Sequence, residues 1–389
     1  MFDFDEIVER RGTHSAKWDE MEASFGVSTD DGLPMWVADM DFKAPQAVNQ
    51  VLIEAAENGV NGYYGDDSRY KASVVNWMSK RHDWQVSPDW VITCAGLVQG
   101  TALCVQAYTE PGDGVILFTP VYHAFSKVIK ANQRVVVESP LVQNQGRYEM
   151  DLDALETSLN GKEKLVVMCS PHNPGGRVWT KEEIQDLANF CARHNLVLVV
   201  DEIHHDLVFP PNKHTVATLA APEHEQNMVI LAATTKTFNI ASALTGAAII
   251  PNPELRDKFK YVLNAAGIGP NRMGMLMATA AYEQGEAWLE ALVEYLDENR
   301  RIFDEGINSI KRLKSMPLEA TYLSWVDFSE TGLSPKEVIE KVQSEAKIAA
   351  NHGSTFGLGG EMFLRFNLAT PRSRVIEAIA RLQHVFASE

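Results

Sequence analysis

The chain has 389 residues, of which 45% are hydrophobic and 22% charged, so it can bury a large core and is too long for one compact domain. Its formal net charge of −17 argues against binding to the phosphates of nucleic acids. No apolar run approaches the ~18 residues of a membrane span, and the N-terminal residues lack a signal-peptide core, so we expect a cytoplasmic protein. The cysteines fit this expectation: Cys94, Cys104, Cys169 and Cys191 have no CxxC spacing and are expected to be buried, reduced thiols.

Residues 1–45 show no regular pattern, whereas from about 46 to 285 helical patterns alternate with short apolar runs. The apolar runs cover 114–120, 133–140, 164–171, 196–202, 228–233 and 246–251. Most are nearly continuous rather than alternating, which is typical of strands buried on both faces. Residues 180–195 form an amphipathic segment with Thr180 and Glu183 in a capping-box pattern. The sequence therefore predicts an α/β domain with a mostly parallel sheet.

The pattern changes after residue 285. A long helical stretch over 286–313 is followed by an alternating run, 321–329, which predicts a half-exposed strand. The end of the chain predicts a strand and then a helix. We expect a large domain over 46–285 and a smaller α+β domain built from 1–45 and 286–389.

Polar side chains follow several of the predicted strands, at the edge where an open α/β sheet binds ligands. Tyr122, Asn173, Asp201 and Lys236 each lie at the end of an apolar run or within three residues after it. Taken singly, each has an ordinary interpretation: the lysine as a solvated residue, the asparagine and the aspartate as turn formers, and the tyrosine as core. Their common placement at successive strand ends is what favours a shared ligand.

Pyridoxal 5'-phosphate (PLP) would use all of these groups. A lysine in a largely apolar site can form a Schiff base, and a carboxylate can keep a pyridine nitrogen protonated. An amide can bind a ring hydroxyl, and a tyrosine can stack on the ring. The Gly96 turn precedes a predicted helix whose N-terminal amides could receive a phosphate. The sequence therefore predicts a PLP site built on Lys236.

Motifs along the whole chain resemble those of the fold-type I PLP enzymes, the class I/II aminotransferase superfamily. The matching segments are 2–19, 33–42, 61–70, 109–125, 170–179 ("SPHNPGGRVW"), 199–209, 235–241 ("TKTFNIA") and 363–372. The stretch "PMWVADMDF" points to the MalY/PatB branch, the C–S β-lyases often called cystathionine β-lyases. The resemblance implies the PLP-dependent transferase-like fold, with a mostly parallel seven-stranded sheet flanked by helices and a smaller α+β domain.

The resemblance also implies roles for residues. Lys236 would carry the cofactor and move the Cα proton, Asp201 would pair with the pyridine nitrogen, Asn173 would contact the ring oxygen, and Tyr122 would stack on the ring. Arg365 would bind the substrate α-carboxylate, with a bidentate geometry that lysine cannot supply. The residues implied at the phosphate or along the cofactor are Gly96, Leu97, Val98, Thr234, His204 and, from the neighbouring subunit, Tyr63. This last contact implies a homodimer with shared active sites.

The chain departs from the family pattern at two places. Many members carry an arginine eight residues after the lysine, where this chain has Leu244. The sequence therefore does not determine which residues near 242–246 contact the phosphate. The stretch "GYYGDD" is shorter than the family pattern, so Tyr63 and Tyr64 are alternatives for the intersubunit contact. No metal site is predicted, because His204 and His205 are adjacent, and adjacent residues of a strand face opposite sides.

Together these observations predict a PLP-dependent C–S β-lyase. It would cleave L-cystathionine or related L-cysteine S-conjugates to a thiol, pyruvate and ammonia by α,β-elimination. Two alternatives remain: a class I/II aminotransferase, which needs the same cofactor contacts, and a regulatory interaction protein on the same scaffold.

Overall fold

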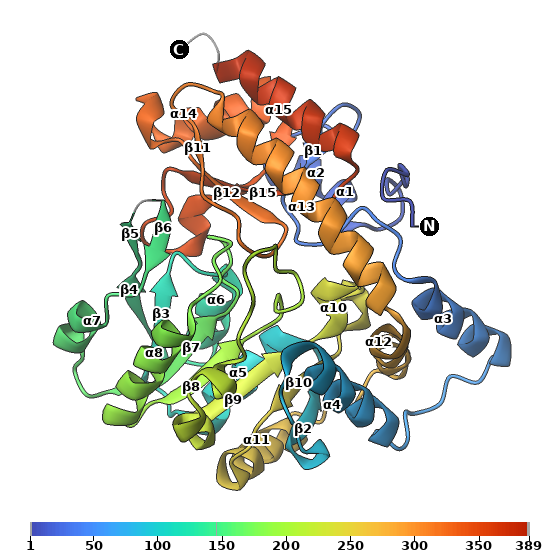
Figure 1. The fold of residues 1–389 in the computed structure, drawn as a ribbon, viewed down its shortest axis with the longest axis vertical. Coiled ribbons are helices and arrows are strands. Elements are labelled where there is room, and N and C mark those ends of the chain that lie inside the picture. Colours follow the sequence, from blue (N-terminus) through green and yellow to red (C-terminus); the bar gives the residue numbers. More distant parts are fainter. Residues whose placement is uncertain (1, 145, 387–389) are drawn as a thin grey trace.

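A seven-stranded sheet forms the centre of the computed structural model, which describes residues 2–144 and 146–386 (Figure 1). Its strands run in the order β2-β10-β9-β8-β7-β3-β4. They are β2 (Val91–Cys94), β3 (Gly114–Thr119), β4 (Val135–Pro140), β7 (Glu163–Cys169), β8 (Val197–Asp201), β9 (Met228–Ala232) and β10 (Gly246–Ile249). Neighbours from β4 to β9 are parallel, and β10 is antiparallel to both β9 and β2. The predicted fold and strand number are confirmed, and the sheet is mixed through β10.

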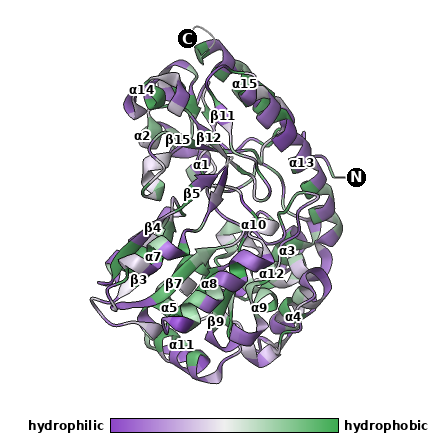
Figure 2. Ribbon diagram, turned by 60° about the vertical axis from the view of Figure 1, so that its left-hand side comes forward, coloured by the Kyte–Doolittle hydropathy of each residue, from purple (hydrophilic) through white to green (hydrophobic). Residues whose placement is uncertain are grey.

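Helices cover the sheet and the rest of the core, with their hydrophobic faces turned inward (Figure 2). They are α1 (Ala16–Asp19), α2 (Met21–Phe25), α3 (Gln46–Asn58), α4 (Ser68–His82), α5 (Leu97–Tyr108), α6 (His123–Ala131), α7 (Leu152–Ser158), α8 (Lys181–Arg193), α9 (Ala217–Ala220), α10 (Thr234–Thr237), α11 (Pro253–Ala265), α12 (Arg272–Gln284), α13 (Glu286–Asn308), α14 (Pro335–Glu340) and α15 (Arg372–Phe386). The capping box predicted for α8 is present: Thr180 Oγ1 accepts a hydrogen bond from the Glu183 amide, and the Glu183 carboxylate accepts one from the Thr180 amide.

Burial of the strands follows their position in the sheet. Strands β3, β9 and β10 are buried throughout, as their continuous apolar runs predict. The run at 133–140 behaves differently, because β4 is an edge strand with a neighbour on one side only, and Val135 is 54% exposed. Continuous apolar sequence therefore does not guarantee burial on both faces.

A second sheet lies above the first in Figure 1 and has the order β11-β12-β15-β14. Its strands are β11 (Lys314–Ser315), β12 (Leu323–Asp327), β14 (Asn351–His352) and β15 (Phe363–Asn367); short pairs form between β1 (Leu33–Pro34) and β13 (Ile348–Ala349) and between β5 (Val142–Asn144) and β6 (Arg147–Glu149). The β1–β13 pair attaches the N-terminal segment to the C-terminal part of the chain. The domain boundaries given above stay a prediction.

The alternating run at 321–329 does not form the half-exposed strand that we expected. Its residues from Leu323 to Val326 are all buried in β12. Trp325 packs against Phe356 and Phe363 and donates a hydrogen bond to the hydroxyl of Tyr148, 3.0 Å away. The prediction was wrong because a distant segment covers the face that the polar residues suggested was open.

Two further expectations concern the cysteines and membrane spans. All four cysteines are free and buried. Within residues 2–144 and 146–386, we find no helix with the length and apolar content needed to cross a bilayer.

Candidate active site

A cavity of about 200 Å³ opens at the carboxyl ends of the parallel strands. Most of the residues predicted from strand ends and motifs line it: Gly96, Leu97, Val98, Tyr122, Asn173, Asp201, His204 and Lys236. Thr234 and Arg365 adjoin it, since Thr235 lines the cavity and Arg365 donates a hydrogen bond to Asn173. The fold thus brings together side chains that lie up to about 270 residues apart in the sequence.

Lys236 lies in α10, the short helix that follows β9, and faces the cavity. Its Nζ donates a 2.5 Å hydrogen bond to the carbonyl oxygen of Ala38. Burial lowers the pKa of its amine to about 8, against the opposing effect of the nearby Asp39 carboxylate. Near neutral pH a larger fraction of this amine is neutral than for an ordinary lysine, as a nucleophile or a base requires.

The segment 36–39 holds several site residues through its backbone carbonyls. Ala38 O also accepts from the hydroxyl of Tyr322 at 2.9 Å, and Trp36 O accepts from Arg365 Nη2 at 2.8 Å. The Nδ2 of Asn367 donates to the carbonyls of Val37 and Asp39, each at 2.6 Å. The "WVAD" stretch is therefore a scaffold for Lys236 and Arg365.

Sequence reasoning missed Tyr322 and Asn367. Tyr322 gave no signal, because it lay in a run whose alternation was read as half-exposed. Asn367 gave a weak one, because residues two apart in a strand share a face, and Asn367 follows Arg365 by two positions in β15. A buried polar pair on one face of a strand could have been recognised.

Asp201 is the last residue of β8 and is buried. One oxygen, Oδ1, accepts a 3.0 Å hydrogen bond from the amide of Ile203. Burial nevertheless raises the pKa of Asp201 to about 7, because the charged form loses its hydration. A cation placed against this carboxylate would stabilise its charged form.

Arg365 is buried and fixed by three acceptors. Its Nη1 donates to Asn173 Oδ1 at 3.0 Å, and its Nη2 donates to Asn351 Oδ1 at 2.6 Å as well as to the carbonyl of Trp36. Its Nε has no partner among the residues that the structure describes. Three of the five guanidinium donors are used, and the unpartnered Nε–H is left for an incoming carboxylate.

The contact with Arg365 also orients the amide of Asn173. A guanidinium has no acceptor, so the amide oxygen must face Arg365 and the NH₂ group must point elsewhere. The side chain of Asn173 lines the cavity. Its NH₂ group can donate to an anionic oxygen there.

The N-terminus of α5 fits a phosphate. Gly96 precedes the helix with a φ of 84°, and a Cβ built on it would meet nothing within 4 Å, so the approach is open. The first amides of a helix have no intrahelical acceptor and carry the positive end of its dipole. The buried Oγ1 of Thr234 likewise has no hydrogen-bond partner within the described part of the chain. These free donors are those that a phosphate ester needs.

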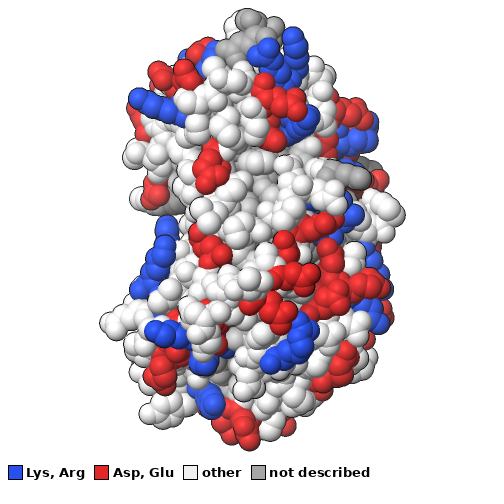
Figure 3. All heavy atoms as spheres, turned by 90° about the vertical axis from the view of Figure 1, so that its left-hand side faces the viewer, with Lys and Arg blue, Asp and Glu red and all other residues white. Residues whose placement is uncertain are grey.

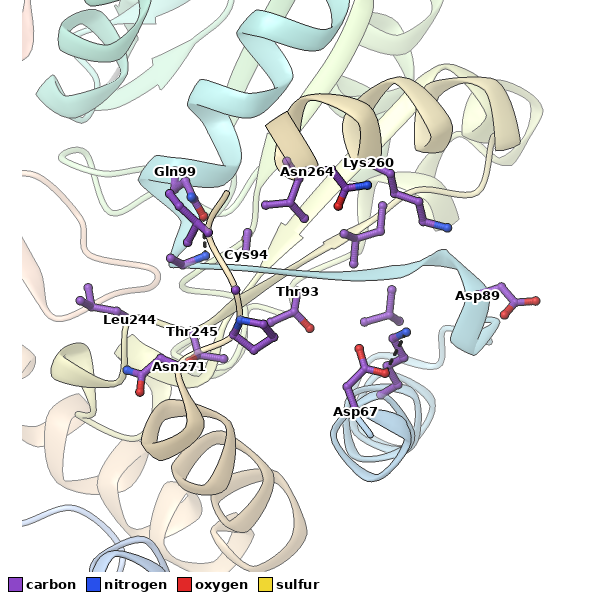
Figure 4. A pocket seen from close by; sticks show the side chains of 18 residues that line it. Asp67, Asp89, Thr93, Cys94, Gln99, Leu244, Thr245, Lys260, Asn264 and Asn271 are labelled. Carbon is purple, nitrogen blue, oxygen red and sulfur yellow. Dashed lines mark hydrogen bonds and ion pairs between the residues drawn. The ribbon is translucent and has the colours of Figure 1, made fainter. Parts of the chain in front are cut away.

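Leu244 lies beside this region and brings no charge. It has a positive φ of 44°, is 60% exposed, and lines both the first cavity and a second one of about 440 Å³. In the second cavity Leu244, Thr245, Gln99 and Asn271 lie at one end, and Asp67 and Asp89 at the other (Figure 4). Residues 242–246 therefore bring no charge to this region.

Tyr63 does not join the site of its own chain. It is fully exposed in the segment between α3 and α4, whereas Tyr64 is partly buried and packs against the core. His204 is buried, with its ring 6.0 Å from that of Tyr322, and its Nδ1 has no partner among the described residues. The phosphate contact predicted for Tyr63 would therefore require a second copy of the chain.

Comparison with known proteins places this site in a family. The profile of the aminotransferase class I and II family matches residues 32–382. The chain belongs to this family. It is 37% identical over 383 residues to cystathionine beta-lyase PatB of Bacillus subtilis, with 98% of each chain covered. It is 33% identical to protein MalY of Escherichia coli, again with 98% of each covered.

Solved structures of family members agree with this membership. Cystalysin from Treponema denticola, which contains pyridoxal 5'-phosphate, superposes with a TM-score of 0.95 at 34% identity, covering 100% of this chain and 99% of that one. A PLP-bound protein of Clostridium difficile 630, provisionally assigned as an aminotransferase, gives 0.96 at 37% identity, covering 99% and 100%. The fold and the branch expected from the motifs are confirmed.

Proposed function

We propose that this protein is a PLP-dependent C–S β-lyase. It acts on L-cystathionine or a related L-cysteine S-conjugate and releases a thiol, pyruvate and ammonia. The observation that carries the proposal is the convergence of Lys236, Asp201 and Arg365 on one cavity, in a chain similar over its full length to a cystathionine beta-lyase.

The residues present fit the cofactor. Asp201 would hold the pyridine nitrogen, Asn173 the ring oxygen and Tyr122 the ring face. Thr234 and the amides of Leu97 and Val98, beside Gly96, would hold the phosphate, and His204 would line the ring. When bound, PLP withdraws electrons from Cα of an attached amino acid and makes its proton acidic.

The chain's own groups then account for binding and proton transfer. Arg365 binds the α-carboxylate through its unpartnered Nε–H and so fixes the position of the Cα–H bond. Lys236, with its pKa lowered to about 8, removes this proton as the general base. A β-substituent that leaves as a thiolate can then depart with the electron pair of its C–S bond.

We further propose a homodimer in the cytoplasm. Tyr63 and Val60 are exposed on one segment, and Leu244 and Ile268 are exposed where they line the second cavity. Covering these side chains with a second copy would bring Tyr63 to the neighbour's phosphate site. Four free, buried cysteines fit a reducing compartment.

An aminotransferase is the alternative that the site itself allows, because transamination needs the same lysine, aspartate and arginine. The test is a product analysis with L-cystathionine and other L-cysteine S-conjugates, in the presence and absence of 2-oxoglutarate. We expect pyruvate, ammonia and thiol in equal amounts when no keto acid is added. Negligible thiol release together with rapid amino transfer to the keto acid would replace the lyase by the aminotransferase.

A further inference from the structure

A second group of buried polar side chains lies next to the active site, on the residues that follow Asp201. Glu202, His205 and Asp206 come from the turn after β8, His214 comes from the segment before α9, and His82 ends α4. All five are less than 9% exposed. Adjacent histidines do point apart, as expected: His204 lines the cofactor cavity, and His205 packs between His82 and His214, with ring centroids 4.3 Å and 6.1 Å away.

Asp206 and His82 satisfy each other and need no further partner. His82 Nε2 lies 2.9 Å from Asp206 Oδ1. The carboxylate also accepts hydrogen bonds from Trp77 Nε1 at 3.1 Å and from Thr237 Oγ1 at 2.9 Å. This half of the cluster is a complete buried hydrogen-bond network.

The other half is incomplete. Glu202 Oε1 accepts from the amide of Ala217 at 2.9 Å. Glu202 Oε2 lies 3.1 Å from His214 Nε2, and His205 Nε2 lies 3.2 Å from Asp206 Oδ2, but neither contact has hydrogen-bond geometry. His205 Nδ1 has no hydrogen-bond partner in the described residues. Leaving even one such group unpaired in a protein interior costs about 1–3 kcal/mol. Glu202, His205 and His214 thus bring polar atoms close together without hydrogen-bond geometry, an arrangement that favours a shared ligand.

We propose that Glu202, His205 and His214 bind a divalent transition-metal ion of the zinc type. One ligand atom from each of the three lies within 4.8 Å of the others, and His214 Nε2 is 3.1 Å from Glu202 Oε2. Ligands about 2.0–2.1 Å from a tetrahedral zinc lie about 3.3 Å apart, and the separation of His214 Nε2 and Glu202 Oε2 is close to this value. A water molecule completes the tetrahedron.

Charge and ligand type select the ion. The two buried carboxylates, Glu202 and Asp206, would bring two negative charges to this cluster when ionised, and a divalent cation can balance them. Two imidazoles and one carboxylate suit Zn²⁺ or Co²⁺, whereas Mg²⁺ and Ca²⁺ prefer oxygen ligands. The ion would connect the turn that follows Asp201 to the segment before α9. This structural role does not depend on which reaction the enzyme catalyses.

The test measures metal binding by the PLP-loaded, tag-free enzyme. After treatment with a chelator, the protein is dialysed against ZnCl₂, and bound zinc is counted by mass spectrometry. The variants Glu202→Gln, His205→Asn and His214→Asn remove one ligand each. His194→Asn is the matched control, because His194 Nε2 lies 2.8 Å from Glu156 Oε1 in a pair with no third ligand.

We expect one zinc per chain in the wild type and in His194→Asn, and at least a tenfold loss of affinity in each ligand variant, as for lost metal contacts generally. Zinc should also raise the unfolding temperature of the wild type and of His194→Asn, and not that of the ligand variants. Absence of stoichiometric zinc in the wild type, or unchanged binding in the ligand variants, overturns the proposal. If the variants do not fold, the chelator-treated wild type is loaded with Co²⁺ and its visible absorption spectrum is recorded. Strong visible bands of a tetrahedral site support the proposal, and their absence refutes it.

Discussion

Asp201 and Lys236 owe their chemistry to burial. Desolvation raises the pKa of the carboxyl to about 7 and lowers that of the amine to about 8, so each is shifted toward its neutral form. Neither shift requires an unusual bond. Each side chain is placed by the end of a buried strand, and such positions are where ligand sites of this fold class occur.

At Asp201 we predict opposite effects on activity and on stability. In the cofactor-free protein the folded pKa lies above the ordinary value, so the folded state holds its proton longer. Stability is therefore lost as pH rises from about 4 to about 7, by on the order of 4 kcal/mol. Asp201→Asn should escape this loss, so urea unfolding of the cofactor-free forms should show its advantage growing with pH.

With PLP bound, the same Asp201→Asn variant should retain the cofactor and lose activity at least tenfold, about 1.4 kcal/mol on the barrier. The enzyme's absorbance reports the bound cofactor, and steady-state kinetics report the loss. A smaller loss would contradict an electronic role for Asp201.

For Lys236 the prediction is covalent attachment. Borohydride reduction of the yellow holoenzyme, followed by peptide mapping, should place the pyridoxyl group on Lys236, because its amine is the one held in the cavity with a lowered pKa. Lys236→Ala should lose the attachment. Recovery of the label on an exposed lysine such as Lys130 would refute the assignment.

The segment 36–39 shows how an element without regular structure organises a site. Its carbonyls bind Lys236, Tyr322 and Arg365, and Asn367 in turn holds the segment from β15. The backbone supplies fixed acceptors at known spacing, and a buried amide keeps them in place. The position of Lys236 thus depends on a strand more than 120 residues further along the chain.

Asn367→Ala should therefore reduce both stability and activity. It leaves the carbonyls of Val37 and Asp39 without their donor, at a cost of about 2–4 kcal/mol. The released segment should also lower kcat/KM at least tenfold.

Thr180→Ala serves as the control, since it removes the capping box of α8 for about 1 kcal/mol at a distance from the cavity. Urea unfolding and kinetics on both variants separate the effects. An equal, small change in kcat/KM for the two would show that the segment has no role in the site.

On the scale of the whole molecule, the surface carries charge of both signs. On the face drawn in Figure 3, acidic and basic side chains are interspersed without a continuous basic patch. This distribution and the net charge of −17 fit a protein that binds small molecules and its own copy. The exposed Tyr63 and Val60 are the apolar side chains that such a copy would cover.

Hybrid dimers test the shared site. If Tyr63 serves the neighbouring subunit, a dimer of one Lys236→Ala chain and one Tyr63→Phe chain has one site in which both groups are intact. Mixing the refolded variants in equal amounts should give about a quarter of the wild-type activity, because about half of the dimers are hybrids with one working site of two. Activity no higher than that of the separate variants would assign the contact to the same chain or to Tyr64.

The sequence by itself determined the six apolar runs, the capping box of α8 and the order of Asn173, Asp201 and Lys236 at strand ends. Local patterns suffice there, because burial on both faces, helix capping and strand termini each leave a signature within a few residues. The same signatures misled where coverage came from far away: β4 is exposed because it is an edge strand, and β12 is buried because the Tyr148 region packs on it.

Only the tertiary structure decided which polar groups meet. Lys236 donates a hydrogen bond to the carbonyl of Ala38, although 198 residues separate the two. Asn367 binds the carbonyl of Val37, next to Ala38. The cluster of Glu202, His205 and His214 likewise depends on the return of the chain before α9. Hydrogen bonds and metal contacts require atoms within about 2–3 Å, and no periodicity in the sequence encodes such proximity between distant segments.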